Sequence, residues 1–241
     1  MSTPSWNGLR LDRHEGDVSV LTLDRPERMN AVTHETFRAL GEAARVVARD
    51  GSRALVLTGA GDRAFSAGYD LAELPGLLQT TVQEFLDIED TASGAVAAFH
   101  ALPIPVVAAV NGAAAGGGLS LALAADFRLV ADTASFSAAF ARVGFSVGEL
   151  GTSWMLSRLV GPGLAAELSF TGRSVSADEA LRIGLADRVL EPGILLSTAI
   201  ELAQDLADPA RDDRIGKRTL TSAGETASFE VALRSRLADR S

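Results

Sequence analysis

The sequence contains no cysteine, and its three histidines, His14, His34 and His100, stand far apart along the chain. The absence of cysteine excludes a disulfide framework, thiolate zinc sites and a cysteine nucleophile. Because the histidines form no group with the spacing of metal ligands, we expect neither a metal site nor metal-assisted catalysis. The sequence therefore predicts a protein that uses neither thiol nor metal chemistry.

Long apolar runs and a surplus of basic residues are also missing. No stretch reaches the roughly 18 apolar residues of a membrane span, and residues 1–6 show no basic region followed by an apolar segment. The formal net charge of -9 opposes nonspecific attraction to nucleic acid and to anionic lipid. We therefore expect a cytoplasmic protein without nucleic-acid or membrane partners, in which local cations or helix N-termini hold any phosphate.

What the sequence does have is enough apolar material for a sizeable core. Of its 241 residues, 47% are hydrophobic, which suits one large domain or one domain with an appendage. Strand-like and helix-like apolar patterns alternate along the chain, which predicts an α/β fold. We expect a core over residues 1–190 and a C-terminal helical segment over residues 191–241.

The expected elements follow from periodicity and from turn and cap residues. Strands are predicted within 9–23, where residues 15–17 join two of them, and at 53–58, 106–110, 127–130 and 187–190. Helices are predicted after a Thr33 cap, over 82–102 and 119–125, and from a capping box at Ser176 and Glu179 to near Gly184. Residues 195–206 carry an apolar helical face that the core does not wholly cover, which predicts an oligomer.

Two glycine-bearing turns, residues 64–70 (AFSAGYD) and 111–119 (NGAAAGGGL), each follow a strand-like apolar run. Glycine permits close approach of the backbone, so the two turns could direct two backbone N–H groups at one point. Fixed donors that converge in this way form an oxyanion hole, which stabilises negative charge as it develops on an oxygen. The residues therefore predict an enzyme that stabilises an enolate-like oxyanion.

Four ordered segments resemble the crotonase, or enoyl-CoA hydratase/isomerase, superfamily. They are residues 23–31 (LDRPERMNA), 64–71 (AFSAGYDL), 107–118 (VAAVNGAAAGGG) and 124–131 (AADFRLVA), and the similarity continues through 170–180 and 184–189. The resemblance implies a spiral of repeated strand-strand-helix units in two stacked sheets, with C-terminal helices that pack homotrimers or hexamers. It also implies an acyl-CoA thioester substrate, of which coenzyme A is a part, and no redox cofactor or metal.

Carried over by position, the oxyanion-hole donors are the backbone N–H groups of Tyr69 and Gly117. Gly117 also lies at the start of the helix predicted after it, where peptide dipoles favour negative charge. The family's hydratases resemble each other in using two glutamates, but Ser120 and Phe140 occupy those positions here. We expect Gly116, Ser120 and Phe140 in the substrate pocket.

Glu149 is the candidate acid/base, because it falls where some isomerases and a dehalogenase of the superfamily carry an aspartate. A surface glutamate at a helix start is the alternative interpretation. One carboxylate suffices to move a double bond from the 3,4 to the 2,3 position of an acyl-CoA, whereas hydration benefits from a second group. Isomerisation is therefore favoured. Hydration, another enolate reaction and a catalytically idle acyl-CoA binder remain alternatives.

Two segments match the parts of the family that contact coenzyme A. Arg28, Met29 and Ala31 match the loop that meets the nucleotide, and Ala67, Gly68, Asp70 and Leu71 match the segment along adenine and pantetheine. Arg28 could contact a phosphate. The alternative interpretations are that Arg28 is a solvated turn residue and that Asp70 caps the helix after it.

Overall fold

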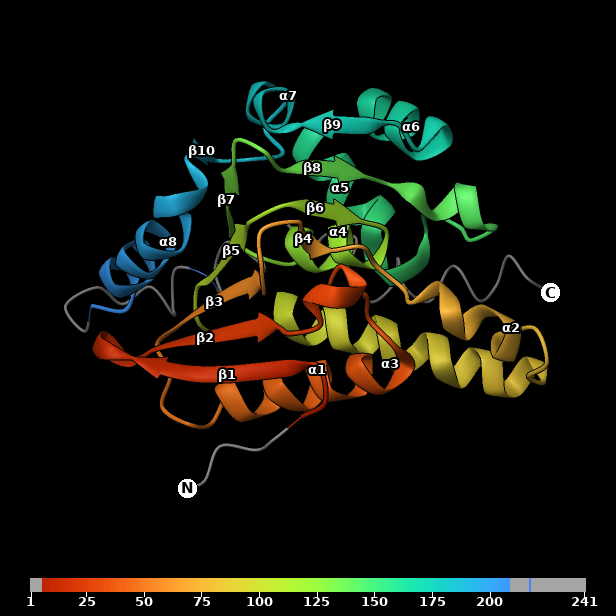
Figure 1. Cartoon of the computed structure of the whole chain (residues 1–241), viewed down its shortest axis with the longest axis horizontal. Coiled ribbons are helices and arrows are strands. Elements are labelled where there is room, and N and C mark those ends of the chain that lie inside the picture. Colours follow the sequence, from red (N-terminus) through yellow and green to blue (C-terminus); the bar gives the residue numbers. More distant parts are fainter. Residues whose placement is uncertain (1–5, 209–216, 218–241) are drawn as a thin grey trace.

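The computed structural model describes residues 6–208 and Lys217, and their strands form two sheets of unequal size (Figure 1). The larger sheet has the order β1 (Leu9–His14), β2 (Val18–Leu23), β3 (Ala54–Gly59), β5 (Val106–Val110), β7 (Phe127–Ala131) and β10 (Arg188–Leu190). The smaller sheet has the order β4 (Ala64–Ser66), β6 (Ala113–Ala115), β8 (Ser135–Ser137) and β9 (Ser174–Ser176).

The chain passes repeatedly from the larger sheet to the smaller one. Strands β3, β5 and β7 are parallel neighbours, and each leads directly into a short strand of the second sheet, namely β4, β6 and β8. Those short strands are also parallel to one another. The α/β spiral of two sheets that the family resemblance implies is thereby confirmed, and three successive turns leave the smaller sheet at the same edge.

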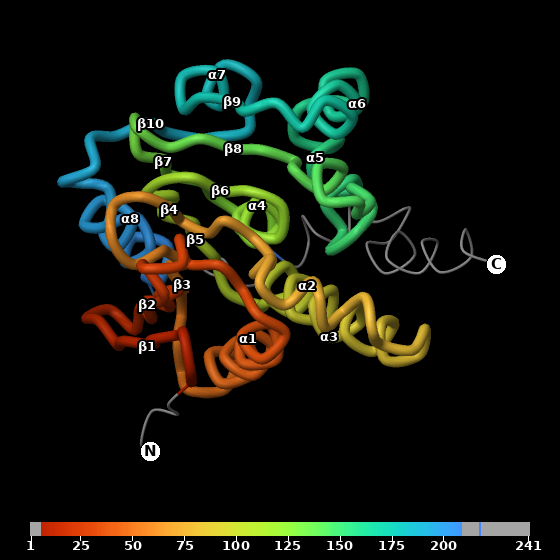
Figure 2. The backbone as a smooth tube through the Cα atoms, turned by 45° about the vertical axis from the view of Figure 1, so that its right-hand side comes forward, coloured from red at the N-terminus to blue at the C-terminus, as the bar shows by residue number. Residues whose placement is uncertain are grey.

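Eight α-helices in the described residues connect and cover the strands. They are α1 (His34–Val47), α2 (Leu74–Leu77), α3 (Val82–His100), α4 (Gly117–Leu123), α5 (Thr152–Val160), α6 (Pro162–Thr171), α7 (Ala177–Arg182) and α8 (Pro192–Leu206). Helices α1 and α3 pack side by side, as both overall views show (Figures 1 and 2). Short 3-10 turns add η1 (Glu15–Asp17), η2 (Pro26–Arg28), η3 (Leu71–Glu73), η4 (Ala139–Val143) and η5 (Glu149–Gly151).

The expected helix caps are present, with one correction. Thr33 caps α1 by accepting a hydrogen bond from the backbone N–H of Thr36 at 3.1 Å. Ser176 likewise accepts from the N–H of Glu179, but the carboxylate of Glu179 pairs with Arg173 at 2.8 Å. The expected capping box at α7 is therefore only half formed, because a guanidinium outcompetes the backbone N–H for that carboxylate.

Helix α8 packs on the larger sheet against β2, β3, β5 and β7. Its side chains Leu195, Ala199 and Ala203 are fully buried there, whereas Ile194 and Leu196 are 48% and 42% exposed. The boundary expected at residue 190 stays a prediction, because α8 continues the core, and residues 209–216 and 218–241 lie outside the described residues. No helix among the described residues has the length and hydropathy needed to cross a bilayer.

A buried arginine joins the last strand of the sheet to its neighbours. The Arg128 side chain, on β7, donates from Nε to the Leu185 carbonyl at 2.8 Å and from Nη1 to the Ala125 carbonyl at 2.7 Å. Its guanidinium also pairs with Asp187, which accepts from the Arg128 backbone N–H at 2.7 Å. Because Arg128 is 4% exposed, water cannot replace these bonds without opening the structure.

We expect Arg128→Met to lower the free energy of unfolding by about 3 kcal/mol, because two buried carbonyls lose a charged donor. Urea unfolding followed by circular dichroism measures the change. The control is Arg188→Met on β10, where the side chain is exposed and little effect is expected. Equal stability of the two variants would contradict the structural role of Arg128.

Candidate active site

The two glycine turns meet through their backbones. Gly68 has φ +86°, and a Cβ atom placed on it would lie 2.5 Å from the Ala115 carbonyl oxygen and 3.0 Å from the Gly117 nitrogen. A Cβ atom on Gly118 would lie 2.2 Å from the Ser66 carbonyl oxygen. The close approach therefore requires glycine on both turns, as the sequence pattern predicts.

The backbone N–H groups of Tyr69 and Gly117 have no hydrogen-bond acceptor among the described residues. Their neighbours do have acceptors: Asp70 N–H donates to Val32 at 3.0 Å, and Gly116 N–H donates to Ser137 at 3.0 Å. Two donors that are fixed by bonded neighbours and lack a partner of their own are suited to a ligand oxygen. Neither group is used by the helix or sheet pairing that would exclude such a role.

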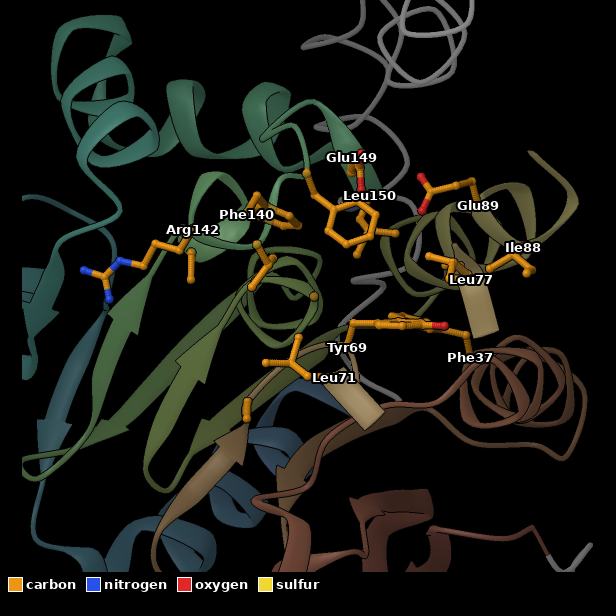
Figure 3. Close-up of a pocket in the computed structure, with 17 residues that line it drawn as sticks. Phe37, Tyr69, Leu71, Leu77, Ile88, Glu89, Phe140, Arg142, Glu149 and Leu150 are labelled. Atoms are coloured by element: carbon orange, nitrogen blue, oxygen red, sulfur yellow. The ribbon is translucent and has the colours of Figure 1, made fainter. Parts of the chain in front are cut away.

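Both donors belong to residues that line one cavity of about 220 Å³ (Figure 3). Most of its lining is apolar. Of the predicted site residues, seven contribute to the lining: Ala67, Tyr69, Leu71, Gly116, Gly117, Phe140 and Glu149. The topology explains this convergence, because the residues that follow the parallel strands β4, β6 and β8 emerge at the same edge of the smaller sheet.

Glu149 enters the cavity from a sharp turn. The side chain is 4% exposed, and its Oε1 accepts a hydrogen bond from the Ser146 backbone N–H at 3.3 Å. The next residue, Leu150, has φ +56° and ψ +20°, a left-handed backbone conformation that residues other than glycine rarely adopt. Burial excludes the alternative of a surface glutamate, and Glu149 lines the same cavity as Tyr69 and Gly117.

The side chain of Tyr69 is held beside the cavity by a chain of polar contacts. Burial, followed by the charge of Glu73 and a hydrogen bond with it, raises the pKa of the Tyr69 phenol well above its ordinary value. Glu73 Oε2 in turn accepts from the backbone N–H of His34, at the start of α1, at 2.9 Å. Figure 3 shows the Tyr69 side chain among the residues that line the cavity. Tyr69, which supplies one backbone donor, is thereby held both at its phenol, by Glu73, and at its backbone, by the bond of the neighbouring Asp70 N–H to Val32.

Ser120 does not lie where we expected it. The residue is fully buried on α4, and its hydroxyl lies 2.6 Å from the Thr152 hydroxyl and donates to the Gly116 carbonyl at 3.2 Å. It is not among the residues that line the cavity. The Ser120 hydroxyl thus ties α4 to α5, since a buried hydroxyl requires a partner, and its contact with a substrate stays a prediction.

The two segments expected to contact coenzyme A lie side by side. Ala67 N–H donates to the Met29 carbonyl at 2.9 Å, and Val32 N–H, just after Ala31, donates to the Gly68 carbonyl at 2.8 Å. Arg28, Met29, Ala31, Gly68 and Asp70 are not part of the cavity lining. They form an adjacent pair of loops, and their contact with a nucleotide stays a prediction.

Asp70 has a structural role. Its carboxylate caps η3 by accepting from the Ala72 N–H at 3.1 Å, and it also pairs with Arg28 at 2.8 Å and Arg25 at 3.1 Å. The hydrogen bond from Arg28 is the main reason that the pKa of Asp70 is lowered. The cap interpretation is thus confirmed. The Arg28 side chain remains 48% exposed, so it retains donors that face solvent.

Glu89, on α3, is one of the cavity residues that sequence reasoning did not place in the site. Its side chain is 7% exposed and lines the same cavity as Glu149. The signal was present in the sequence, because Glu89 falls four residues after Phe85 and three before Ala92, on the apolar face of the predicted helix. A carboxylate on a buried helix face is unusual and indicates either a buried partner or a functional site.

Comparisons with known proteins agree with this geometry. The model of the enoyl-CoA hydratase/isomerase family matches residues 13–232. A short-chain-enoyl-CoA hydratase of Clostridium acetobutylicum is 38% identical over 202 residues, which cover 81% of this chain and 74% of that protein.

Two solved structures extend the likeness to the fold. A putative enoyl-CoA hydratase from Streptomyces coelicolor A3(2) has a TM-score of 0.88 and 36% identity, covering 100% of this chain and 87% of that one. A monofunctional enoyl CoA isomerase from M. smegmatis has a TM-score of 0.76 and 39% identity, covering 94% and 98%. The similar proteins thus include both a hydratase and an isomerase by name.

We expect Gly118→Ala to lower the free energy of unfolding by about 2 kcal/mol and to reduce turnover, because the new methyl group displaces the start of α4 from β4. The matched control is Gly163→Ala on α6, where a Cβ atom meets nothing within 4 Å. Thermal unfolding and enzyme assays on both variants measure the difference. A Gly118→Ala protein with wild-type stability would show that the close approach of the turns is not required.

Proposed function

The chain belongs to the enoyl-CoA hydratase/isomerase family, and we propose that it converts 3-enoyl-CoA into 2-enoyl-CoA with Glu149 as the proton-transferring base. The observation that carries this proposal is the meeting of three groups at one cavity. Two are the residues whose backbone N–H groups lack acceptors among the described residues, Tyr69 and Gly117, and the third is a buried carboxylate, Glu149.

In the proposed reaction, the thioester oxygen accepts hydrogen bonds from the N–H groups of Tyr69 and Gly117. Glu149 removes a proton from C2, and the electron pair left on carbon delocalises onto the thioester oxygen as an enolate. The same carboxyl group then returns the proton to C4, and the double bond moves from C3=C4 to C2=C3. The reaction moves one proton, so it requires neither a metal nor a redox cofactor.

The arrangement around Ser120 supports isomerisation. Hydration by the residues at the family's two glutamate positions, Ser120 and Phe140, is less favoured. The Ser120 hydroxyl is engaged with Thr152 and lies outside the cavity lining, and Phe140 offers no polar atom. Neither residue is placed to hold a water molecule beside the substrate. An acid/base group at Glu149 is sufficient for a proton shift, because C2 and C4 lie on one short segment of the acyl chain.

The apolar lining of the cavity suits the acyl chain of a thioester. The nucleotide part of coenzyme A is proposed to lie along the paired loops that contain Met29, Ala31 and Gly68, with a phosphate near the half-exposed Arg28. Asp70 would act there through Arg28, because it holds the guanidinium by an ion pair.

We expect Glu149→Gln to lower the rate of 3-hexenoyl-CoA isomerisation by at least about 100-fold, because the amide cannot accept the C2 proton. Exchange of C2 protons of a saturated acyl-CoA into deuterated water, followed by mass spectrometry, should be lost as well. Binding of butanoyl-CoA in calorimetry should change little. The control is Glu191→Gln, an exposed glutamate before α8, which should retain full activity.

Unchanged turnover in Glu149→Gln would remove that residue from the mechanism. If the wild-type protein binds enoyl-CoA but catalyses neither turnover nor C2 proton exchange, the protein is an idle acyl-CoA binder and the proposal fails.

We also propose that the protein assembles into a homotrimer or hexamer. The support is the outer face of α8, where Ile194 and Leu196 remain about half exposed on a helix whose other face is buried. Light scattering at micromolar concentration should give three or six times the 25.1 kDa mass of the chain. A monomer under these conditions would contradict the proposal.

A further inference from the structure

The proposed reaction depends on the spacing of two groups that different elements supply. The N–H donor of Gly117 lies at the start of α4, whereas Glu149 lies at the start of η5. Proton transfer to and from a bound thioester is fast only while this spacing is kept, because a misplacement of about 1 Å can cost about 100-fold in rate. A contact that joins the two backbones therefore bears on catalysis.

Two hydroxyl groups, those of Ser120 and Thr152, make such a contact, and we call them the hydroxyl bridge. Both residues are 0% exposed, and their hydroxyl oxygens lie 2.6 Å apart. The Thr152 hydroxyl donates to the Glu149 carbonyl at 3.0 Å, and the Ser120 hydroxyl donates to the Gly116 carbonyl at 3.2 Å. Because the Thr152 proton is used at Glu149, the Ser120 proton is shared between Thr152 and Gly116 in a three-centre bond.

At its α4 end, the hydroxyl bridge acts on the peptide that carries an oxyanion-hole donor. The Gly116 carbonyl and the Gly117 N–H belong to one planar trans peptide, so they point in opposite directions. The Ser120 backbone N–H also donates to the Gly116 carbonyl, at 3.0 Å. Holding this carbonyl therefore fixes the direction of the N–H group on the other side of the peptide.

At its η5 end, the hydroxyl bridge acts on the backbone of the base. The Glu149 carbonyl accepts from both the backbone N–H and the hydroxyl of Thr152. The two residues between them, Leu150 and Gly151, have φ +56° and +69°, a left-handed conformation that is costly for leucine. The hydroxyl of Thr152 thus closes the turn that follows Glu149.

We propose that Ser120 and Thr152 are positioning residues, whose hydroxyl bridge fixes the Glu149 backbone relative to the Gly117 donor. The inference rests on the proposed function, which assigns the base to Glu149 and the donor to Gly117. Neither Ser120 nor Thr152 is among the residues that line the cavity. The pair therefore acts through the backbone of the catalytic groups and not by contact with the substrate.

The test compares two substitutions of Thr152 in the full-length protein. Thr152→Val keeps the shape of the side chain but has no hydroxyl, whereas Thr152→Ser keeps the hydroxyl. We expect Thr152→Val to lower kcat for 3-hexenoyl-CoA isomerisation about 10-fold and to change KM less than about 2-fold, because the base shifts while the binding site stays. C2 proton exchange should fall by the same factor as kcat. Thr152→Ser should stay within about 2-fold of wild type.

Ser120→Ala interrupts the hydroxyl bridge from its other end. It should lower kcat by a similar factor, and the double variant with Thr152→Val should be little worse than either single variant, because groups that act as one unit are not additive. The matched control is Ser169→Ala on α6. The buried Ser169 hydroxyl donates to the Ala165 carbonyl at 2.6 Å, also four residues earlier, but Ser169 does not line the cavity. This variant should keep the wild-type kcat.

Each other outcome overturns the inference. A wild-type kcat in Thr152→Val and Ser120→Ala removes the hydroxyl bridge from catalysis and leaves the proposed isomerisation intact. A loss of thermal stability with full kcat at low temperature assigns the pair a structural role only. Additive losses in the double variant, or a Thr152→Ser protein as slow as Thr152→Val, show that no bridge operates. If the wild-type protein catalyses neither isomerisation nor C2 proton exchange, the proposed function fails, and this inference fails with it.

Discussion

The contact between two backbone segments, at Gly68 and Gly117, is the constraint on which the rest of the site depends. It brings the turn after β4 against the turn after β6 so closely that a side chain at position 68 would collide with the neighbouring backbone. The spiral topology makes the contact possible, because parallel strands end at one edge and their following residues emerge together. The cavity, the two available donors and the place for a thioester oxygen all follow from this arrangement.

Around this contact, the site combines rigid donors with a carboxylate held in a sharp turn. Tyr69 is fixed through its neighbour's bond to Val32 and through the contact of its phenol with Glu73. Glu149 is fixed by the left-handed Leu150 that follows it. Such preorganisation is what electrostatic catalysis requires, because donors that must move into place lose part of their benefit to reorganisation.

Much of the fold could be predicted from the sequence, because it depends on local signals. The Thr33 cap, the hairpin around residues 15–17 and the alternating buried strands are all encoded by neighbouring residues. The cavity lining by Tyr69, Gly117 and Glu149 followed from ordered motifs. What sequence reasoning could not place was the direction of individual side chains. Ser120 turns toward Thr152, and Glu89 joins the cavity, because helix packing decides which neighbour each side chain meets.

Three turns border the cavity, and they contribute different things. The turns after β4 and β6 supply the two backbone donors, and Tyr69 and Leu71 after β4 add side chains to the lining, whereas the turn after β8 contributes Phe140 and no donor of this pair. Substitutions in the third turn can therefore reshape the space around the acyl group without disturbing the donors that the first two supply. A change of acyl specificity can therefore arise by substitutions in the turn after β8, which is separate from the backbone donors that stabilise the negative charge.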